Sequence, residues 1–228
     1  MAKNKKKEKS VLNVVFVLDE TGSMESVKET TLSGFNEYID SLKKKQEEGG
    51  EVRFTLVLFN SGEIRTVFND VLIKEVIGLN NDTYIPNNLT PLYDAVGKTI
   101  RETESRLSKG SEVLFVTMTD GHENSSKEYN QALIFNLIKT KEIEDKWIFA
   151  FMGANQDSWA TGNSIGLSKK ASTMNYSQGQ EEVAFRTLTE VTFNALRDYS
   201  KSYRVGAFSK QDEDTTNSTS SVSRTTHN

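Results

Sequence analysis

The sequence predicts an α/β protein with a doubly wound, mostly parallel sheet that carries helices on both faces. Short apolar runs alternate along the chain with stretches of helical spacing, which is the pattern of such folds. The first run, residues 11–18, is almost entirely apolar, as expected for a strand buried on both faces. The chain has 228 residues, 36% of them hydrophobic. This is enough for one sizeable hydrophobic core, whereas two separate domains would each have a small one.

The first half of the chain supplies three predicted strands and one helix. Residues 11–18 and 51–60 are apolar strands, and Ser61-Gly62 forms a tight turn into a third strand over residues 63–71, so these last two form an antiparallel hairpin. A helix over residues 24–45 is predicted from apolar positions at helical spacing. These positions are Val27, Thr31, Phe35, Tyr38 and Leu42.

A polar loop over residues 80–90 leads to a second predicted helix, residues 90–107. Thr90 suits its N-cap and Pro91 its first position, while Leu92, Val96 and Ile100 share one face. The apolar run over residues 112–121 then predicts a buried strand that stops at Asp120.

The last part of the chain continues the alternation. A helix is marked by Tyr129, Leu133, Leu137 and Ile138. The other expected elements are a strand (147–155), a short helix (156–166), an edge strand (171–176) and a long final helix (180–203). The residues expected on or near the apolar face of that final helix are Val183, Leu188, Val191, Ala195 and Tyr199.

Composition separates one domain, residues 11–208, from two tails. Residues 1–10 form a basic tail, and residues 209–228 are rich in serine and threonine with Val222 as their one aliphatic residue. Neither tail can bury enough apolar surface to offset the entropy of ordering, so both are expected to be disordered.

Charge and residue types exclude several classes of function. The first ten residues carry five lysines and one glutamate, and since the whole chain carries −4, the remainder carries −8. An acidic body of this kind is not expected to bind nucleic acid. The absence of cysteine excludes disulfides, Fe–S clusters and thiolate zinc sites.

The expected location is cytoplasmic, without membrane association. No apolar stretch approaches the ~20 residues of a membrane-spanning helix. The basic start followed by an apolar run has the outline of a secretory signal, but the run contains Asn13, ends in Asp19-Glu20 and lacks a small-residue cleavage site.

Three predicted segments end in oxygen-bearing side chains. Asp19, Thr21 and Ser23 follow the first strand, Thr90 precedes the second helix, and Asp120 follows the 112–119 strand. Loops at the carboxyl ends of parallel strands gather at one edge of a sheet, and two carboxylates there repel unless a cation lies between them. Hard oxygen donors of this kind suit Mg²⁺ or Mn²⁺.

Each of these residues also has a purely structural interpretation. Ser23 and Thr90 are good helix caps, and Asp120-Gly121 is an ordinary turn pair. The chain's two histidines, His122 and His227, are too few for a nitrogen-based zinc site. His122 is expected on the rim of the site, and Glu123 and Asn124 are expected to order the loop behind Asp120.

Taken together, the three segments resemble a von Willebrand factor type A (VWA) domain over residues 11–203. Residues 19–24, DETGSM, resemble the family's Asp-x-Ser/Thr-x-Ser motif, Thr90 falls at its single threonine ligand, and Thr119-Asp120-Gly121 resemble its second aspartate loop. The resemblance implies a six-stranded sheet in which only the 63–71 strand is antiparallel. It also implies a metal-ion-dependent adhesion site with one position open for a partner's carboxylate. Thr21 replaces a more frequent serine and keeps the hydroxyl.

The expected function is therefore a cation-dependent protein-binding module, not an enzyme, with a partner that presents an Asp or Glu. Similarity to bacterial and phage single-domain relatives implies an intracellular adaptor within a complex that also holds an ATPase. The alternative is a metal-assisted hydrolase such as a phosphatase. Haloacid-dehalogenase-type phosphatases need a second aspartate two positions after the first, where this chain has Thr21, and neither a serine nucleophile elbow nor a P-loop is present.

Overall fold

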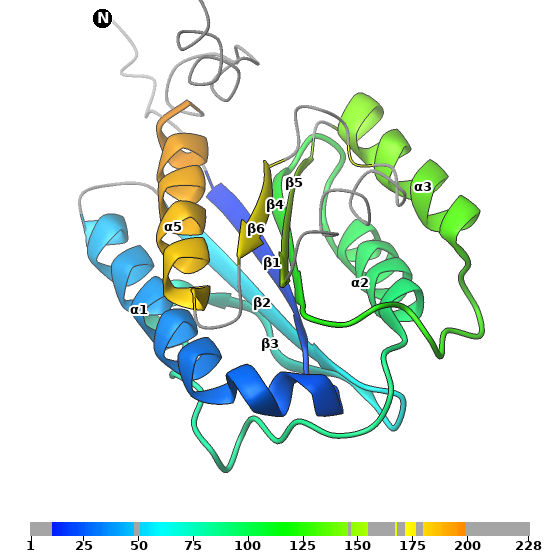
Figure 1. The fold of residues 1–228 in the computed structure, drawn as a ribbon. Coiled ribbons are helices and arrows are strands. Elements are labelled where there is room, and N and C mark those ends of the chain that lie inside the picture. The colour runs from blue at the N-terminus through cyan, green and yellow to red at the C-terminus, as the bar shows by residue number, and fades with distance from the viewer. Residues whose placement is uncertain are drawn as a thin grey trace, which may run out of the picture.

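The computed structural model describes residues 11–47, 51–145, 147–154, 167, 172–176 and 180–198, and these form an α/β fold (Figure 1). Within them six strands make one sheet in the order β3-β2-β1-β4-β5-β6. The strands are β1 (Val11–Asp19), β2 (Glu51–Phe59), β3 (Ile64–Leu72), β4 (Glu112–Thr119), β5 (Ile148–Ala154) and β6 (Ser172–Tyr176). Neighbouring strands are parallel except β2 and β3, so the predicted sheet is confirmed.

Helices cover both faces of this sheet (Figure 1). α1 (Lys28–Glu47) and α5 (Glu181–Asp198) lie on one face, and α2 (Leu92–Arg106) and α3 (Gln131–Thr140) on the other. A 3-10 helix (Gly22–Val27) precedes α1, another (Ile73–Glu75) follows β3, and a π-helical turn (Lys141–Asp145) extends α3. None of the helices in the described ranges is long and apolar enough to cross a membrane.

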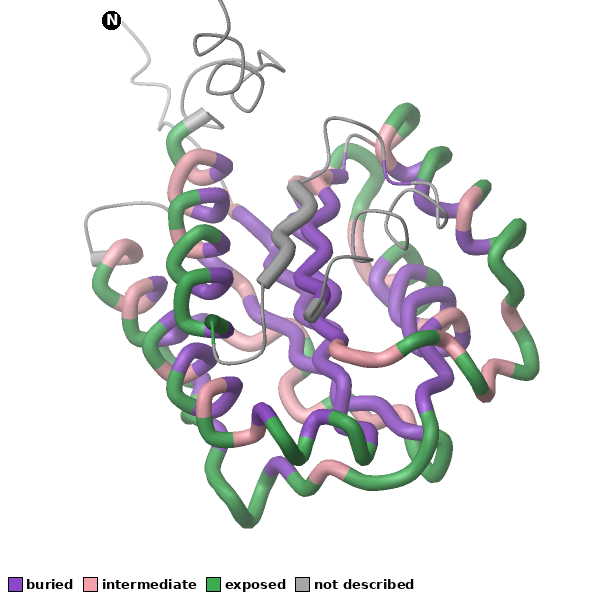
Figure 2. Tube along the Cα trace, in the orientation of Figure 1, coloured by how far each residue is buried: buried purple, intermediate pink, exposed green. Residues whose placement is uncertain are grey.

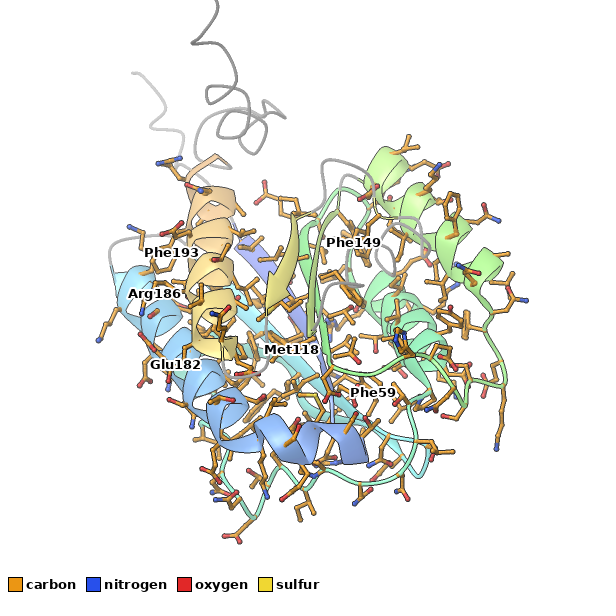
Figure 3. The ribbon with its side chains drawn as sticks, viewed as in Figure 1. Phe59, Met118, Phe149, Glu182, Arg186 and Phe193 are labelled. Carbon is orange, nitrogen blue, oxygen red and sulfur yellow. The ribbon has the colours of Figure 1, made fainter. Side chains whose placement is uncertain are left out.

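The central strands are buried on both sides because the apolar side chains of β1 alternate between two cores (Figure 2). Phe16 of β1 packs edge-on against Phe35 of α1, with ring centroids 5.6 Å apart, and is stacked with Phe185 of α5 at 6.2 Å. Phe59 and Met118 show the same division at the carboxyl ends of β2 and β4 (Figure 3). Phe59 joins the α2/α3 core and Met118 the α1/α5 core.

The predicted hairpin is confirmed. Asn60 and Glu63 exchange backbone hydrogen bonds of 2.9 and 3.2 Å around Ser61-Gly62, and the Asn60 side-chain oxygen accepts from the amides of Gly62 and Glu63. Farther along, the β2–β3 register shifts twice, and Asp70 has a left-handed φ of 56°. Arg53 Nε donates to Asp70 Oδ1 at 2.8 Å and holds this irregular stretch in place.

Three predictions about helices were wrong. The first helix does not begin as an α-helix at residue 24, because residues 22–27 form the 3-10 helix. Thr90 does not cap α2, because Pro91 occupies the N-cap position. The N-cap residue makes no side-chain hydrogen bond to the first turn of the helix. On α5, Leu188, Val191 and Ala195 are buried as predicted, and only the assignment of Val183 was wrong: it is 58% exposed, whereas Ala184 and Phe185 face the core. The predicted 156–166 helix, Tyr199 and both tails lie outside the described residues.

The carboxyl of Glu112, the first residue of β4, is expected to make the free energy of unfolding depend on pH. Burial raises the pKa of its carboxyl to about 7. The folded state therefore binds this proton more tightly than the unfolded chain, and the associated stability is lost as the pH rises through 7. Glu112→Gln should therefore unfold at a higher temperature than the wild type at pH 8 and at the same temperature at pH 4. Glu102→Gln, an exposed change on α2, should show no such dependence on pH.

Candidate metal centre

The structure brings all five predicted side chains together at the sheet edge where β1 ends (lower edge in Figure 1). Ser23 Oγ donates to Asp120 Oδ1 at 2.6 Å and lies 3.3 Å from Thr21 Oγ1. Thr90 Oγ1 donates to Thr21 Oγ1 at 3.3 Å, and the Thr21 amide donates to Asp19 Oδ1 at 2.7 Å. Three distant segments therefore meet in one continuous hydrogen-bonded group.

The group is deep on one side and open on the other. Asp19, Thr21 and Thr90 are buried, whereas Ser23 is exposed and Asp120 is half-buried. This arrangement leaves access from solvent past Ser23 and Asp120. His122, next in line after Gly121, is exposed, as expected for a rim residue.

Asp19 is the most constrained member of the group. Its Oδ2 accepts from the Thr119 hydroxyl at 2.5 Å, and its backbone carbonyl accepts from the Tyr84 hydroxyl at 2.6 Å. Burial raises the pKa of Asp19 to about 6 despite the hydrogen bonds from Thr119 and Thr21, which lower it. Burial also raises the pKa of Asp120. Two desolvated carboxyls at one edge are therefore a place where a bound cation would relieve an electrostatic cost.

The donor set fits a hard divalent cation. Its members are two carboxylates and three hydroxyls, all oxygen donors that Mg²⁺ and Mn²⁺ accept, and water can complete an octahedral shell. Gly121 lies close to the hydroxyls of Thr90 and Ser23. A Cβ at this position would lie 3.2 Å from Thr90 Oγ1 and 3.3 Å from Ser23 Oγ. Among the described residues no group of three or more His, Asp or Glu could hold a metal, so a cation here depends on the hydroxyls.

The loop after β4 holds Thr90 in position. The Thr90 amide donates to Asn124 Oδ1 at 2.8 Å, and the Asn124 amide donates to the Thr90 carbonyl at 3.0 Å. Glu123 Oε2 accepts from the Tyr93 amide at 2.9 Å, and therefore caps α2 from another segment. The expectation that Glu123 and Asn124 order this loop is confirmed, and they also tie it to the Thr90 segment.

Two further acidic residues stabilise the site and were not identified from the sequence. Asp94, in the first turn of α2, accepts from three successive backbone amides, those of residues 127–129. Glu20 is buried, pairs with Arg65 at 2.8 Å, and accepts from the Ile85 amide at 2.8 Å. Neither role could be inferred from local sequence, because each partner lies more than 30 residues away along the chain.

Removing the Asn124 side chain tests whether this support matters for the metal. Asn124→Ala is expected to weaken Mn²⁺ affinity about tenfold, which is typical when a residue that orients a metal ligand is lost. Asn81→Ala is a matched control, because the Asn81 side-chain amide donates to Glu29 Oε1 at 3.2 Å in an exposed hydrogen bond. Titration calorimetry measures both, and equal affinities for the two variants would contradict the assignment.

Comparisons with known proteins give a fold and no close relative. No family model matches the chain, and no curated protein matches it. Similar solved structures include a von Willebrand factor type A protein from Catenulispora acidiphila (TM-score 0.55, 15% identity, covering 79% of this chain and 42% of that one). Another is the von Willebrand factor domain of a type V pilus tip protein from Porphyromonas gingivalis (TM-score 0.56, 9% identity, 82% and 97%).

A third is the pilus adhesin SpaC from Lactobacillus rhamnosus GG in an open conformation (TM-score 0.60, 12% identity, covering 86% of this chain and 31% of that one). This chain thus spans less than half of two of these three proteins and nearly all of the pilus tip domain. The strand order, the single antiparallel pair and these similarities agree, and the chain therefore has the fold of the von Willebrand factor A domains.

Proposed function

We propose that this protein is a divalent-cation-dependent protein-binding module. Asp19, Thr21, Ser23, Thr90 and Asp120 would hold Mg²⁺ or Mn²⁺, directly or through water, and an Asp or Glu of a partner protein would complete the shell. The observation that carries the proposal is the convergence of three separate segments into one oxygen-lined group that opens to solvent past Ser23 and Asp120.

The similar structures support an interaction role. One is described as a pilus adhesin and another as a pilus tip domain, and neither description names an enzyme. We propose that the protein acts as an intracellular adaptor, within a cytoplasmic complex that also contains an ATPase. The pilus proteins among the similar structures make the cell surface the competing location, and cell fractionation distinguishes the two.

The competing function is a metal-assisted phosphatase. The Thr21 hydroxyl, at the position where an acid–base aspartate is required, contacts Ser23 and Thr90 and offers no carboxylate. Phosphate release from a simple phosphate ester in Mg²⁺ is the direct test, and turnover that disappears in Asp19→Ala would replace the binding proposal.

The proposed function is tested by affinity capture from the native cell in Mg²⁺ and in EDTA. We expect one or more partners that bind in Mg²⁺, are released by EDTA and return when Mg²⁺ is restored. Thr90→Ala should weaken their capture at least tenfold while its circular dichroism stays unchanged, because it removes one buried hydroxyl from the metal shell. Thr187→Ala, an exposed change on α5, is the control. Partners captured equally in Mg²⁺ and EDTA would show that this edge is not the binding face.

A further inference from the structure

The loop before Thr90 is bonded directly onto the first ligand segment. The Gly22 amide donates to the Asn88 carbonyl at 3.1 Å, and the Asn87 amide donates to the Glu20 carbonyl at 3.0 Å. Together with the Ile85 amide on Glu20 Oε1, these bonds fix the backbone of residues 85–88 beside Glu20–Gly22. Asn88 has a left-handed φ of 65°, a conformation that asparagine tolerates better than most residues.

This fixed loop holds apolar side chains in water beside the candidate metal centre. Leu89 is 56% exposed and Ile85 54% exposed. The backbone of Leu89 is bonded on both sides to Ser61: its amide donates to Ser61 Oγ at 3.1 Å, and its carbonyl accepts from the Ser61 amide at 2.9 Å. With its backbone fixed in this way, the Leu89 side chain cannot become buried by a change of the loop backbone without breaking those bonds. Large exposed apolar groups next to a polar site are typical of interaction surfaces.

A surface groove begins at Leu89 and leads away from the candidate metal centre. It has a volume of about 490 Å³ and lies between α2 and the β2–β3 hairpin. Leu89 and Pro91, the two neighbours of Thr90, both line it, and Val57 and Ile64 add apolar surface farther along. Two of its charged groups are already engaged, since Lys98 pairs with Glu128 at 2.7 Å and the Asp94 carboxylate accepts three amides. Most of the remaining lining residues are polar or charged, Glu63, Glu102 and Lys127 among them, so an apolar occupant is favoured beside Leu89 and not along the whole groove.

We propose that the partner segment carries an apolar residue directly adjacent to its metal-binding carboxylate, and that this residue packs on Leu89 at the start of the groove. The inference rests on the proposed function and adds the chemistry of the partner. The Cα atoms of Leu89 and Thr90 are about 3.8 Å apart, as in any trans peptide, so the partner residues nearest to Leu89 are the immediate neighbours of the carboxylate in the partner chain. Burying one aliphatic side chain corresponds to about a tenfold gain in affinity or more.

The test is selection of random heptapeptides displayed on phage against the full chain in Mg²⁺, with elution by EDTA. We expect enriched peptides in which Asp or Glu is directly followed or preceded by Leu, Ile, Met or Phe. Selection against Leu89→Ser should keep the acidic residue and lose the apolar neighbour, and a selected peptide should bind this variant about tenfold more weakly. Ile143→Ser is the matched control, since Ile143 is 75% exposed in the turn before β5, at the opposite edge of the sheet.

The outcomes separate this inference from the function on which it rests. EDTA-eluted peptides that are acidic but show no apolar neighbour, or the same preference in Leu89→Ser, would overturn the inference and leave the metal-dependent function standing. Apolar peptides that lack an acidic residue and resist EDTA would overturn the proposed function instead. Mn²⁺ affinity equal to that of the wild type, measured by calorimetry, is expected for Leu89→Ser and shows that the variant keeps its fold and its metal centre.

Discussion

Asp19→Ala is expected to abolish Mg²⁺ and Mn²⁺ binding, with an affinity loss of at least a hundredfold. Asp19 is the buried carboxylate of the candidate centre, and both of its oxygens are oriented by hydrogen bonds from Thr21 and Thr119. Removing it takes away one of the two carboxylates of the candidate centre, and three hydroxyls with one carboxylate bind Mg²⁺ poorly. Calorimetric titration with Mn²⁺ measures the loss, and Asp120→Ala should behave in the same way.

Two controls accompany this measurement. Asp82→Ala removes an exposed carboxylate from the loop that leads to Thr90 and should leave the affinity unchanged. Asp19→Asn keeps the size of the side chain and removes the charge, so it should also fail to bind metal while unfolding, in EDTA, within a few degrees of the wild type. Unchanged affinity in Asp19→Ala and Asp120→Ala would show that this edge does not bind the cation.

Gly34→Val is expected to destabilise the α1/α5 layer strongly. A Cβ at Gly34 would lie 2.2 Å from Cδ2 of Phe185, and that ring is buried and stacked with Phe16. The ring cannot leave without opening the packing between α1 and α5, so the expected cost is about 3 kcal/mol. For a domain of this size that cost lowers the midpoint of thermal unfolding by roughly 6–12 °C.

The neighbouring residue supplies the control. Ser33→Val places the same β-branched side chain one position earlier on α1, where the side chain is exposed. It should cost no more than the small helix-propensity difference, about 0.5 kcal/mol. Equal melting temperatures for Gly34→Val and Ser33→Val would mean that α5 does not pack on α1 as closely as the structure shows.

The features that sequence reasoning predicted correctly depend on local pattern. The apolar run of β1 and the Ser61-Gly62 turn each follow from a few consecutive residues. The meeting of Asp19 and Asp120 could be predicted for a related reason, since Asp19 ends β1, Asp120 follows β4, and parallel neighbours bring these ends together, whereas metal binding by the five side chains stays a prediction.

The features that it missed depend on partners far along the chain. Thr90 looked like a helix cap because Pro91 and Leu92 follow it, but the first amides of α2 find their acceptors in Glu123 and Ser126 instead. In the sequence, Glu20 looks like a variable residue between two ligands of the motif. Its partners, Arg65 on β3 and the Ile85 amide in the following loop, come close to it only in the folded structure. On α5 the buried positions Leu188, Val191 and Ala195 were predicted correctly, and only the first turn was misassigned, because Val183, Ala184 and Phe185 are consecutive apolar residues and helical spacing alone does not decide among them.

The irregular β3 strand has a consequence for self-association. β3 is a terminal strand of the sheet, and its outer row of amides and carbonyls could pair with another chain. The two register shifts and the left-handed Asp70 bend this edge away from the straight, evenly spaced ladder that such pairing requires. The same irregularity that Arg53 holds in place therefore protects the protein against edge-to-edge aggregation, and a sequence change that straightened β3 would remove that protection.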